Sequence, residues 1–141
     1  MSSAIHTTNY YNTFIEVAED CPVTVAEKPP AKEYGRTVAS IQFDLISGHP
    51  YQFSSDDVVF SVFFEKNNLN EDKITSQREK FFSKGQPCLR SSPLTKRYGW
   101  GVHSNADGKI AIYDLASEEY KKYSTDKSLQ HVKAMRSKRV S

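Results

Sequence analysis

The sequence contains little cysteine and no long apolar run. Its two cysteines, Cys21 and Cys88, are far apart and form no C-x-x-C pair, which excludes a zinc knuckle and a thioredoxin-type motif. A membrane-spanning helix is excluded as well, because it would need roughly 18 consecutive apolar residues. Residues 1–6 carry no basic segment followed by an apolar run, so they do not form a secretory signal. We therefore expect a cytoplasmic protein with free thiols and no membrane partner.

The composition is that of an ordinary folded domain. The 141 residues are 38% hydrophobic and 26% charged, and 8 Tyr and 8 Phe make the chain too aromatic to be disordered. This length allows a buried core without disulfides. We expect an N-terminal arm over residues 1–12, a single domain over 13–128 and a basic C-terminal tail over 129–141. The tail could form a helix, an edge strand or a loose arm.

Charge is divided unevenly along the chain. Residues 1–65 contain 9 acidic and 3 basic side chains, whereas residues 66–141 contain 8 acidic and 16 basic ones. Such an asymmetry is typical of a surface for an anionic partner. It also results when acidic and basic elements pack beside each other in one fold and their charges cancel, which is the interpretation that we favour.

Two segments have the pattern of β-structure. Residues 13–17 alternate and are rich in β-branched side chains, which predicts a strand. Residues 98–103 and 109–113 flank the turn-forming sequence Ser-Asn-Ala-Asp-Gly, which predicts a β-hairpin over 98–113. Between these segments, residues 85–96 contain two prolines and are expected to form a loop.

Three longer segments have the pattern of helices, namely residues 37–47, 55–66 and 71–84. Thr37 is the expected N-cap of the first. Ser54 and Asp57 form a capping-box variant at the start of the second, ahead of Val and Phe residues that favour a strand over 58–64. We choose a buried helix there, with a central strand as the alternative. A further short helix is expected over 118–123, after Ser117.

These elements predict an α+β fold. A small antiparallel sheet, built from strand 13–17 plus hairpin 98–113, would be covered by about three helices on one face. A C-terminal strand could extend this sheet.

Three stretches of the chain resemble a known family. They are residues 8–15, residues 85–105 with the sequence Lys-Arg-Tyr-Gly-Trp-Gly-Val-His, and residues 133–139. The resemblance extends from about residue 6 to residue 139 and is to a family of small bacterial proteins catalogued only as a domain of unknown function. It implies a bacterial, cytoplasmic, single-domain protein. It supplies no activity or catalytic residue and supports no enzyme class.

Cys88 and His103 are the candidate nucleophile and base for an enzyme. A thiol needs a nearby imidazole or cation to form a thiolate at neutral pH, and His103 lies on the hairpin that follows the Cys88 loop. No glycine-flanked nucleophile turn surrounds Cys88. The 4 histidines lack metal-ligand spacing and the glycines form no phosphate-binding loop, so we expect no metal and no cofactor. An enzyme is the less favoured class.

A ligand-binding groove is the favoured interpretation. Arginine together with aromatic residues recognises small anions, carboxylates and protein surfaces. Residues of this kind lie on the proline loop and the hairpin: Arg90, Arg97, Tyr98, Trp100 and His103. The alternative is that the aromatic residues pack internally and Arg97 is solvated. We therefore expect a non-catalytic binding module for a small anionic ligand or a protein partner.

Nucleic-acid binding is the alternative function. Three helices followed by a hairpin match the order of a winged helix, in which the third helix enters the major groove. That helix would contribute Lys73, Gln77, Arg78, Lys80 and Lys84 to the interface. Three acidic residues on the same segment argue against this function, namely Glu71, Asp72 and Glu79.

Overall fold

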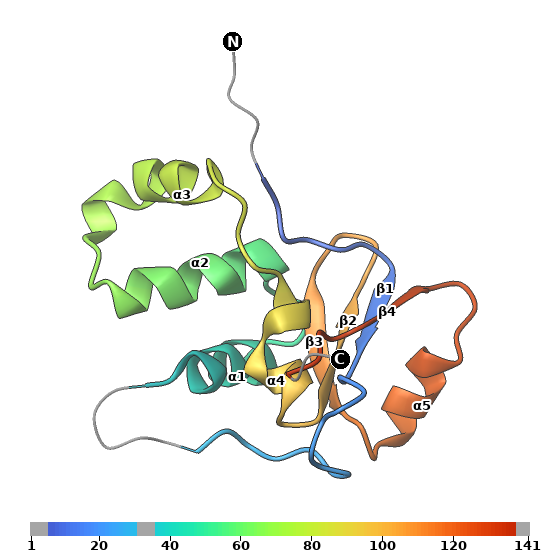
Figure 1. Ribbon diagram of the computed structural model, residues 1–141. Helices are drawn as coiled ribbons and strands as arrows, with labels where there is room; N and C mark the ends of the chain where they lie inside the picture. Colours follow the sequence, from blue (N-terminus) through green and yellow to red (C-terminus); the bar gives the residue numbers. More distant parts are fainter. Residues whose placement is uncertain (1–5, 31–35, 138–141) are drawn as a thin grey trace.

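The computed structural model describes residues 6–30 and 36–137. Its sheet consists of β1 (Thr13–Glu16), β2 (Trp100–Ser104), β3 (Ile110–Asp114) and β4 (Gln130–Lys133), in the order β3-β2-β1-β4 (Figure 1). β2 runs antiparallel to both β1 and β3, whereas β4 runs parallel to β1. The sheet is therefore mixed, because the C-terminal strand joins the antiparallel strands in parallel.

One face of the sheet carries the main core. Helices α1 (Val38–Gly48) and α4 (Pro93–Lys96) lie against this face, and α2 (Ser55–Lys66) packs beside α1. Because side chains alternate along a strand, β1, β2 and β3 each send an apolar residue to this side. These are Ile15, Val102 and Ile110, and they form one buried cluster with Ile46, Val58, Leu89 and Leu94 from the helical layer.

The opposite face of the sheet is covered by α5 (Glu118–Ser124) (Figure 1). Phe14, the β1 residue that points to this side, packs edge-on against Tyr120 of α5 with 5.0 Å between the ring centroids. Gly101 lies beneath the same two rings, and its missing side chain is what allows Tyr120 to approach the strand. The sheet is thus enclosed on both faces.

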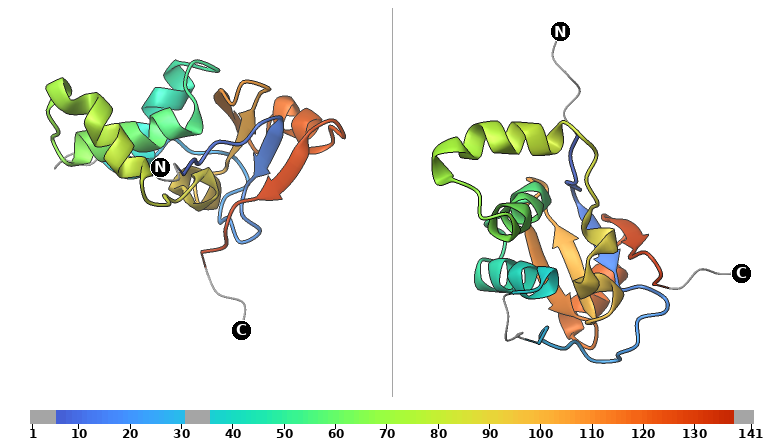
Figure 2. Two further views of the ribbon diagram at one scale, coloured as in Figure 1. Left: turned by 90° about the horizontal axis from the view of Figure 1, so that it is seen from above. Right: turned by 60° about the vertical axis from the view of Figure 1, so that its left-hand side comes forward.

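The helix α3 (Ile74–Phe82), preceded by the 3₁₀ turn Glu71–Lys73, packs on α2 rather than on the sheet (Figure 2). The ring of Phe81 lies 4.5 Å from that of Phe63 and 5.7 Å from that of Phe60. These aromatic contacts explain the position of α3, since Phe81 packs against the outer side of α2. Of the three helices expected to cover the sheet, this one forms a second layer.

Most of the predicted elements are confirmed. The α+β class, the hairpin and the caps at Thr37, Ser54 and Ser117 are present. Residues 58–64 are helical, because the capping box fixes the helix start and tertiary packing outweighs the strand propensity of Val and Phe. The expected loop over 85–96 was wrong in part: it contains the 3₁₀ turn Leu89–Ser91 and α4, whose Ser-Pro start is a recognised helix signal.

The chain on either side of the expected domain 13–128 also contacts the fold. Thr8 is 4% exposed, and its backbone N–H donates to Asp56 Oδ1 at 2.6 Å. At the other end, β4 pairs with β1 at the edge of the sheet, which is the edge-strand alternative that we left open for the basic tail over 129–141. Residues 1–5 and 138–141, the outer parts of the expected arm and tail, lie outside the described residues.

Ion pairs join the acidic and basic parts of the chain. Lys133 and Arg136 both contact Glu19, and Arg78 contacts Asp57. This is the arrangement that results when acidic and basic elements pack beside each other. No helix within residues 6–30 and 36–137 combines the length and apolar character that crossing a bilayer requires.

Replacing Gly101 by Ala tests the packing of α5. A Cβ at this position would come within 2.6 Å of Tyr120 and 2.7 Å of Phe14, so one of the rings must move. We expect a loss of about 1–3 kcal/mol in the free energy of unfolding, as for other overpacked sites. Gly48→Ala is the control, because its Cβ would meet nothing within 4 Å. Equal stability of the two variants in urea unfolding would contradict this account.

Candidate functional site

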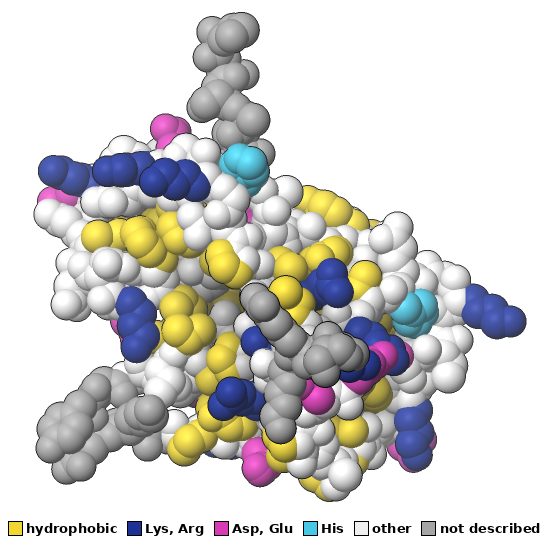
Figure 3. All heavy atoms as spheres, in the orientation of Figure 1, with side chains coloured by type: hydrophobic (Ala, Val, Ile, Leu, Met, Phe, Trp, Pro, Cys, Tyr) yellow, Lys and Arg dark blue, Asp and Glu magenta, His cyan; other side chains and the backbone are white. Residues whose placement is uncertain are grey.

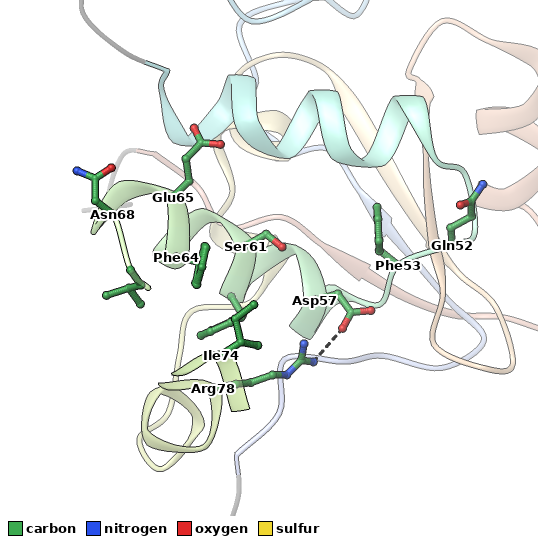
Figure 4. A pocket seen from close by; sticks show the side chains of 11 residues that line it. Gln52, Phe53, Asp57, Ser61, Phe64, Glu65, Asn68, Ile74 and Arg78 are labelled. Atoms are coloured by element: carbon green, nitrogen blue, oxygen red, sulfur yellow. Dashed lines mark ion pairs between the residues drawn. The ribbon is translucent and has the colours of Figure 1, made fainter. Parts of the chain in front are cut away.

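A groove of about 910 Å³ runs along α2 and is closed on one side by α3 (Figure 4). This volume lies within the range of small-molecule sites, which is roughly 300–1,000 Å³. The turn before α2 lines one end of the groove, and the chain after α2 lines the other. Its lining residues are Gln52, Phe53, Asp57, Phe60, Ser61, Phe64, Glu65, Asn68, Leu69, Ile74 and Arg78.

The spacing of residues on α2 explains why the helix presents this wall. Positions 57, 60, 61, 64 and 65 are three or four apart, so they lie on one helical face. Phe60 is buried on this face, and Phe64 is half-buried. On the α3 side Ile74 is 42% exposed, which is unusual for a large apolar residue next to other apolar side chains. The groove therefore offers an apolar surface that the protein leaves open.

Arg78 is the charged residue at one end of the groove. Its Nη2 lies 2.9 Å from Oδ1 of Asp57, and its guanidinium carbon lies 5.7 Å and 5.6 Å from the ring centroids of Phe60 and Phe82. A guanidinium has five N–H donors, and this ion pair engages one of its nitrogens. Arg78 is thus held in place by Asp57 and two rings while keeping donors for a further acceptor.

Asp57 keeps its negative charge at neutral pH because of its partners. Burial raises the pKa of the carboxyl group, but the Ser54 backbone N–H and the Arg78 guanidinium outweigh burial and bring the pKa below its ordinary value. Oδ2 accepts the Ser54 N–H at 2.9 Å, while Oδ1 faces Arg78. One carboxylate therefore caps α2 and positions the arginine of the groove.

At its other end the groove carries an acidic residue with a partner of its own. Glu65 Oε2 lies 3.4 Å from Nε of Arg36, which precedes α1. Because this pair and the Asp57–Arg78 pair are each neutralised, the groove has no large excess charge. It combines an apolar wall with ion pairs at its rim.

Cys88 and His103, the proposed nucleophile and base, lie on different sides of the sheet. Cys88 precedes Leu89 of the main core, and its sulfur lies 3.5 Å from the hydroxyl of Tyr10. His103 points to the α5 face, where its ring stacks on Tyr123 at 4.2 Å. Burial lowers the pKa of His103, although the Asp126 carboxylate acts in the opposite direction. The structure does not bring the two residues together.

The five side chains of the expected ligand groove are also separated. Arg97 and Tyr98 line one pocket of about 350 Å³ beside α1. Arg90 Nε donates to the backbone oxygen of Lys133, and Trp100 Nε1 donates to that of Glu27, while His103 faces α5. Alternation along β2 explains this result, because Trp100 and His103 lie an odd number of residues apart and so project to opposite faces.

Four of the five residues of the expected nucleic-acid interface form two groups on α3 and at its end. Arg78 turns into the groove beside α2, whereas Gln77, Lys80 and Lys84 line a pocket of about 310 Å³ with Phe63 and Phe81. Lys73 is exposed, and Figure 3 shows basic side chains along the outer side of α3. The hairpin is not a free wing, since β2 also pairs with β1. The elements therefore follow the order of a winged helix but not its arrangement.

Sequence reasoning named Arg78 but missed the site around it. The signal was present in residues 57–68, where polar and aromatic residues share one face of the helix. We interpreted those phenylalanines only as core, because the sequence does not reveal that α3 covers just one side of α2. Among residues 6–30 and 36–137, no group of three or more His, Cys, Asp or Glu side chains is placed to hold a metal ion.

Comparison with known proteins gives one match. The family described as "Family of unknown function (DUF6157)" matches residues 5–140, which confirms the resemblance to a domain of unknown function. No curated protein and no solved structure matches the chain.

Replacing Asp57 by Ala tests its double role at the start of α2. We expect a loss of about 1 kcal/mol in unfolding free energy at pH 7, which is typical of a lost helix cap. Because folding lowers the pKa of this carboxyl, its contribution is complete above the unfolded pKa of about 3.9 and disappears as the pH falls through the folded pKa. Wild type and variant should therefore converge in acid.

The exposed carboxylate of Glu79 on α3 provides the control for this experiment. Urea unfolding of Glu79→Ala should show little change in stability at pH 7 or at pH 2. A deficit of Asp57→Ala that stays constant from pH 7 down to pH 2 would contradict the assigned role of the charge.

Proposed function

We propose that this chain, which belongs to the DUF6157 family, is a non-catalytic binding protein for a small apolar molecule that carries a carboxylate. The ligand would lie in the α2–α3 groove, with its apolar part along Phe60 and Phe64 and its carboxylate at Arg78. The observation that carries the proposal is the positioned guanidinium at the end of an open apolar groove. A bacterial, cytoplasmic setting, implied by the family resemblance, is part of the same proposal.

The carboxylate is favoured by the way in which Arg78 is held. Arginine binds carboxylates through paired N–H donors, and such charge-assisted hydrogen bonds are stronger than neutral ones. Asp57 occupies one side of the guanidinium, so the remaining donors fit a single anionic group. A phosphate at Arg78 would bring more negative charge toward the neighbouring Asp57, which argues for the smaller charge.

The apolar part of the ligand is favoured by the side chains along the groove. Burying apolar area yields roughly 25 cal/mol per Å², so a ligand that covers Ile74 and the exposed edge of Phe64 gains affinity from both. Ser61 lies on the same wall and offers a hydroxyl at mid-groove. A medium-chain fatty acid such as decanoate has both required features and is a suitable first probe.

Titration of the purified full chain with decanoate tests the proposal. We expect binding by calorimetry, and Arg78→Gln should weaken it at least about tenfold, because a hydrogen bond to a charged group contributes roughly 1.5–3 kcal/mol. Lys80→Gln is the matched control: it removes one positive charge from the same helix but lies in the other pocket. Decanol, which lacks the carboxylate, should bind wild type and Arg78→Gln alike.

Ser61→Trp provides a second test that leaves the charges intact. The indole should fill the groove and block decanoate binding, while the helix start and the core remain unchanged. Thermal unfolding checks that this variant and Arg78→Gln are folded. Decanoate binding that is unaffected by both substitutions would exclude the groove as the site.

A further inference from the structure

A second pocket lies where α2 meets the end of α3, and it shares no lining residue with the groove. Its volume is about 310 Å³, which is enough for a small ligand. Two aromatic, two basic and two amide side chains form its wall, and no acidic side chain of the described residues is among them. We call the six residues the lysine pocket: Phe63, Gln77, Lys80, Phe81, Lys84 and Gln86.

The polar side of the lysine pocket follows from helical spacing. Gln77, Lys80 and Lys84 are three and four residues apart, so they project from one side of α3. Lys84 comes after the C-cap Ser83, whose backbone is still helical at φ −68° and ψ −16°, and the spacing therefore continues past the end of the helix. Figure 3 shows a row of basic side chains along α3 and a hydrophobic patch beside it. Two ammonium groups are thus carried one turn apart next to aromatic rings.

The end of α3 does not need these lysines as caps. A lysine near a helix C-terminus often donates to one of the last carbonyls, which lack a partner within the helix. Here the carbonyls of residues 80–82 already accept hydrogen bonds, from Ser83, Gln86 and His6 respectively. Both ammonium groups therefore remain available to a ligand.

The charge of the lysine pocket favours a phosphate monoester. Within residues 6–30 and 36–137, neither Lys80 nor Lys84 forms an ion pair. A phosphate monoester carries close to two negative charges at neutral pH, and lysine is a regular partner of phosphate. A carboxylate would neutralise only one of the two ammonium groups. We therefore place the phosphate between the two lysines.

The free amide of Gln77 favours adenine as the organic part of the ligand. This amide has no hydrogen-bond partner in the described part of the chain, so its donor and its acceptor are both open. A glutamine amide pairs with N6 and N7 of adenine through two hydrogen bonds. The rings of Phe63 and Phe81 are only half-buried, which leaves aromatic surface for a base beside the amide.

The helix also sets a suitable distance between the two ends of such a ligand. A phosphate midway between Lys80 and Lys84 lies about 7.5 Å from Gln77 along the helix axis, because each residue advances the helix by about 1.5 Å. A ribose joins base and phosphate over a distance of this order. We propose that the lysine pocket binds adenosine monophosphate (AMP), with its phosphate at Lys80 and Lys84 and its base at Gln77. This site is independent of the carboxylate ligand proposed for the groove.

Calorimetric titration of the full chain with AMP at neutral pH and low ionic strength tests this site. We expect one AMP per chain. Adenosine lacks the phosphate and ribose 5-phosphate lacks the base, so each should bind at least about tenfold more weakly. Inosine monophosphate has a carbonyl where adenine has its N6 amino group, so it should bind at least about fivefold more weakly. Absence of AMP binding, or equal affinity for AMP and adenosine, would overturn the proposal.

Substitutions assign the binding to named side chains. Lys80→Gln and Lys84→Gln should each weaken AMP binding at least about fivefold. Gln77→Ala should remove the preference for AMP over inosine monophosphate but leave ribose 5-phosphate binding unchanged. Arg78→Gln is the matched control, because it removes one positive charge from the same helix but lies in the groove. AMP binding that survives both lysine substitutions, or that Arg78→Gln weakens equally, would contradict the site. Thermal unfolding shows that each variant is folded.

A single-stranded nucleic acid is the competing occupant of this face. Lys73 lies seven residues before Lys80, on the same side of the chain, and a strand could reach it whereas AMP could not. An oligoadenylate without a terminal phosphate should bind more weakly than AMP, since its internal phosphates each carry one charge. Tighter binding of the oligoadenylate, together with its loss in Lys73→Gln, would assign the face to a strand and overturn the proposal.

Discussion

The first turn of α2 connects three parts of the fold through a few hydrogen bonds. Ser54 and Asp57 cap each other reciprocally, which fixes where the helix starts. Ser54 also forms a bridge with Lys109 at the hairpin, and Asp56 accepts hydrogen bonds from the backbone and side chain of Thr8. The helix, the sheet and the N-terminal segment are therefore tied together within one turn of chain.

The same turn also fixes α3. Oδ1 of Asp57, which takes no part in the cap, pairs with Arg78 of α3. The contacts of Phe81 with Phe60 and Phe63 also hold α3 against α2. Because α3 packs on α2 and not on the sheet, it leaves part of the α2 surface uncovered. The groove lies on this uncovered surface. Its Arg78 is oriented by Asp57, which also caps the start of α2.

The sequence was sufficient for the fold class and for most of the elements, because their signals are local. The Ser54–Asp57 cap, the hairpin turn and the strand 13–17 each depend on neighbouring residues. The candidate site depends on long-range packing and could not be predicted in this way. Cys88 and His103 are near in sequence but lie on opposite sides of the sheet, whereas Tyr51 and Tyr123 are 72 positions apart and meet. Alternation along a strand predicts which residues share a face, but not which helix covers it.

The short segment 51–53 shows how closely two unrelated surfaces can be built together. Tyr51 points to the α5 face, whereas Gln52 and Phe53 line the groove on the other side of the molecule. In an extended chain, neighbouring side chains point to opposite sides, but each residue also advances the backbone by about 3.3 Å. A straight segment would therefore move some of these side chains away from the surfaces that they reach here. The positive φ of Tyr51 folds the chain back on itself at this point. The backbone N–H of Tyr51 donates to Ile110, and the α2 cap at Ser54 follows three residues later. The segment 51–53, held at both ends, thus supplies side chains to both surfaces.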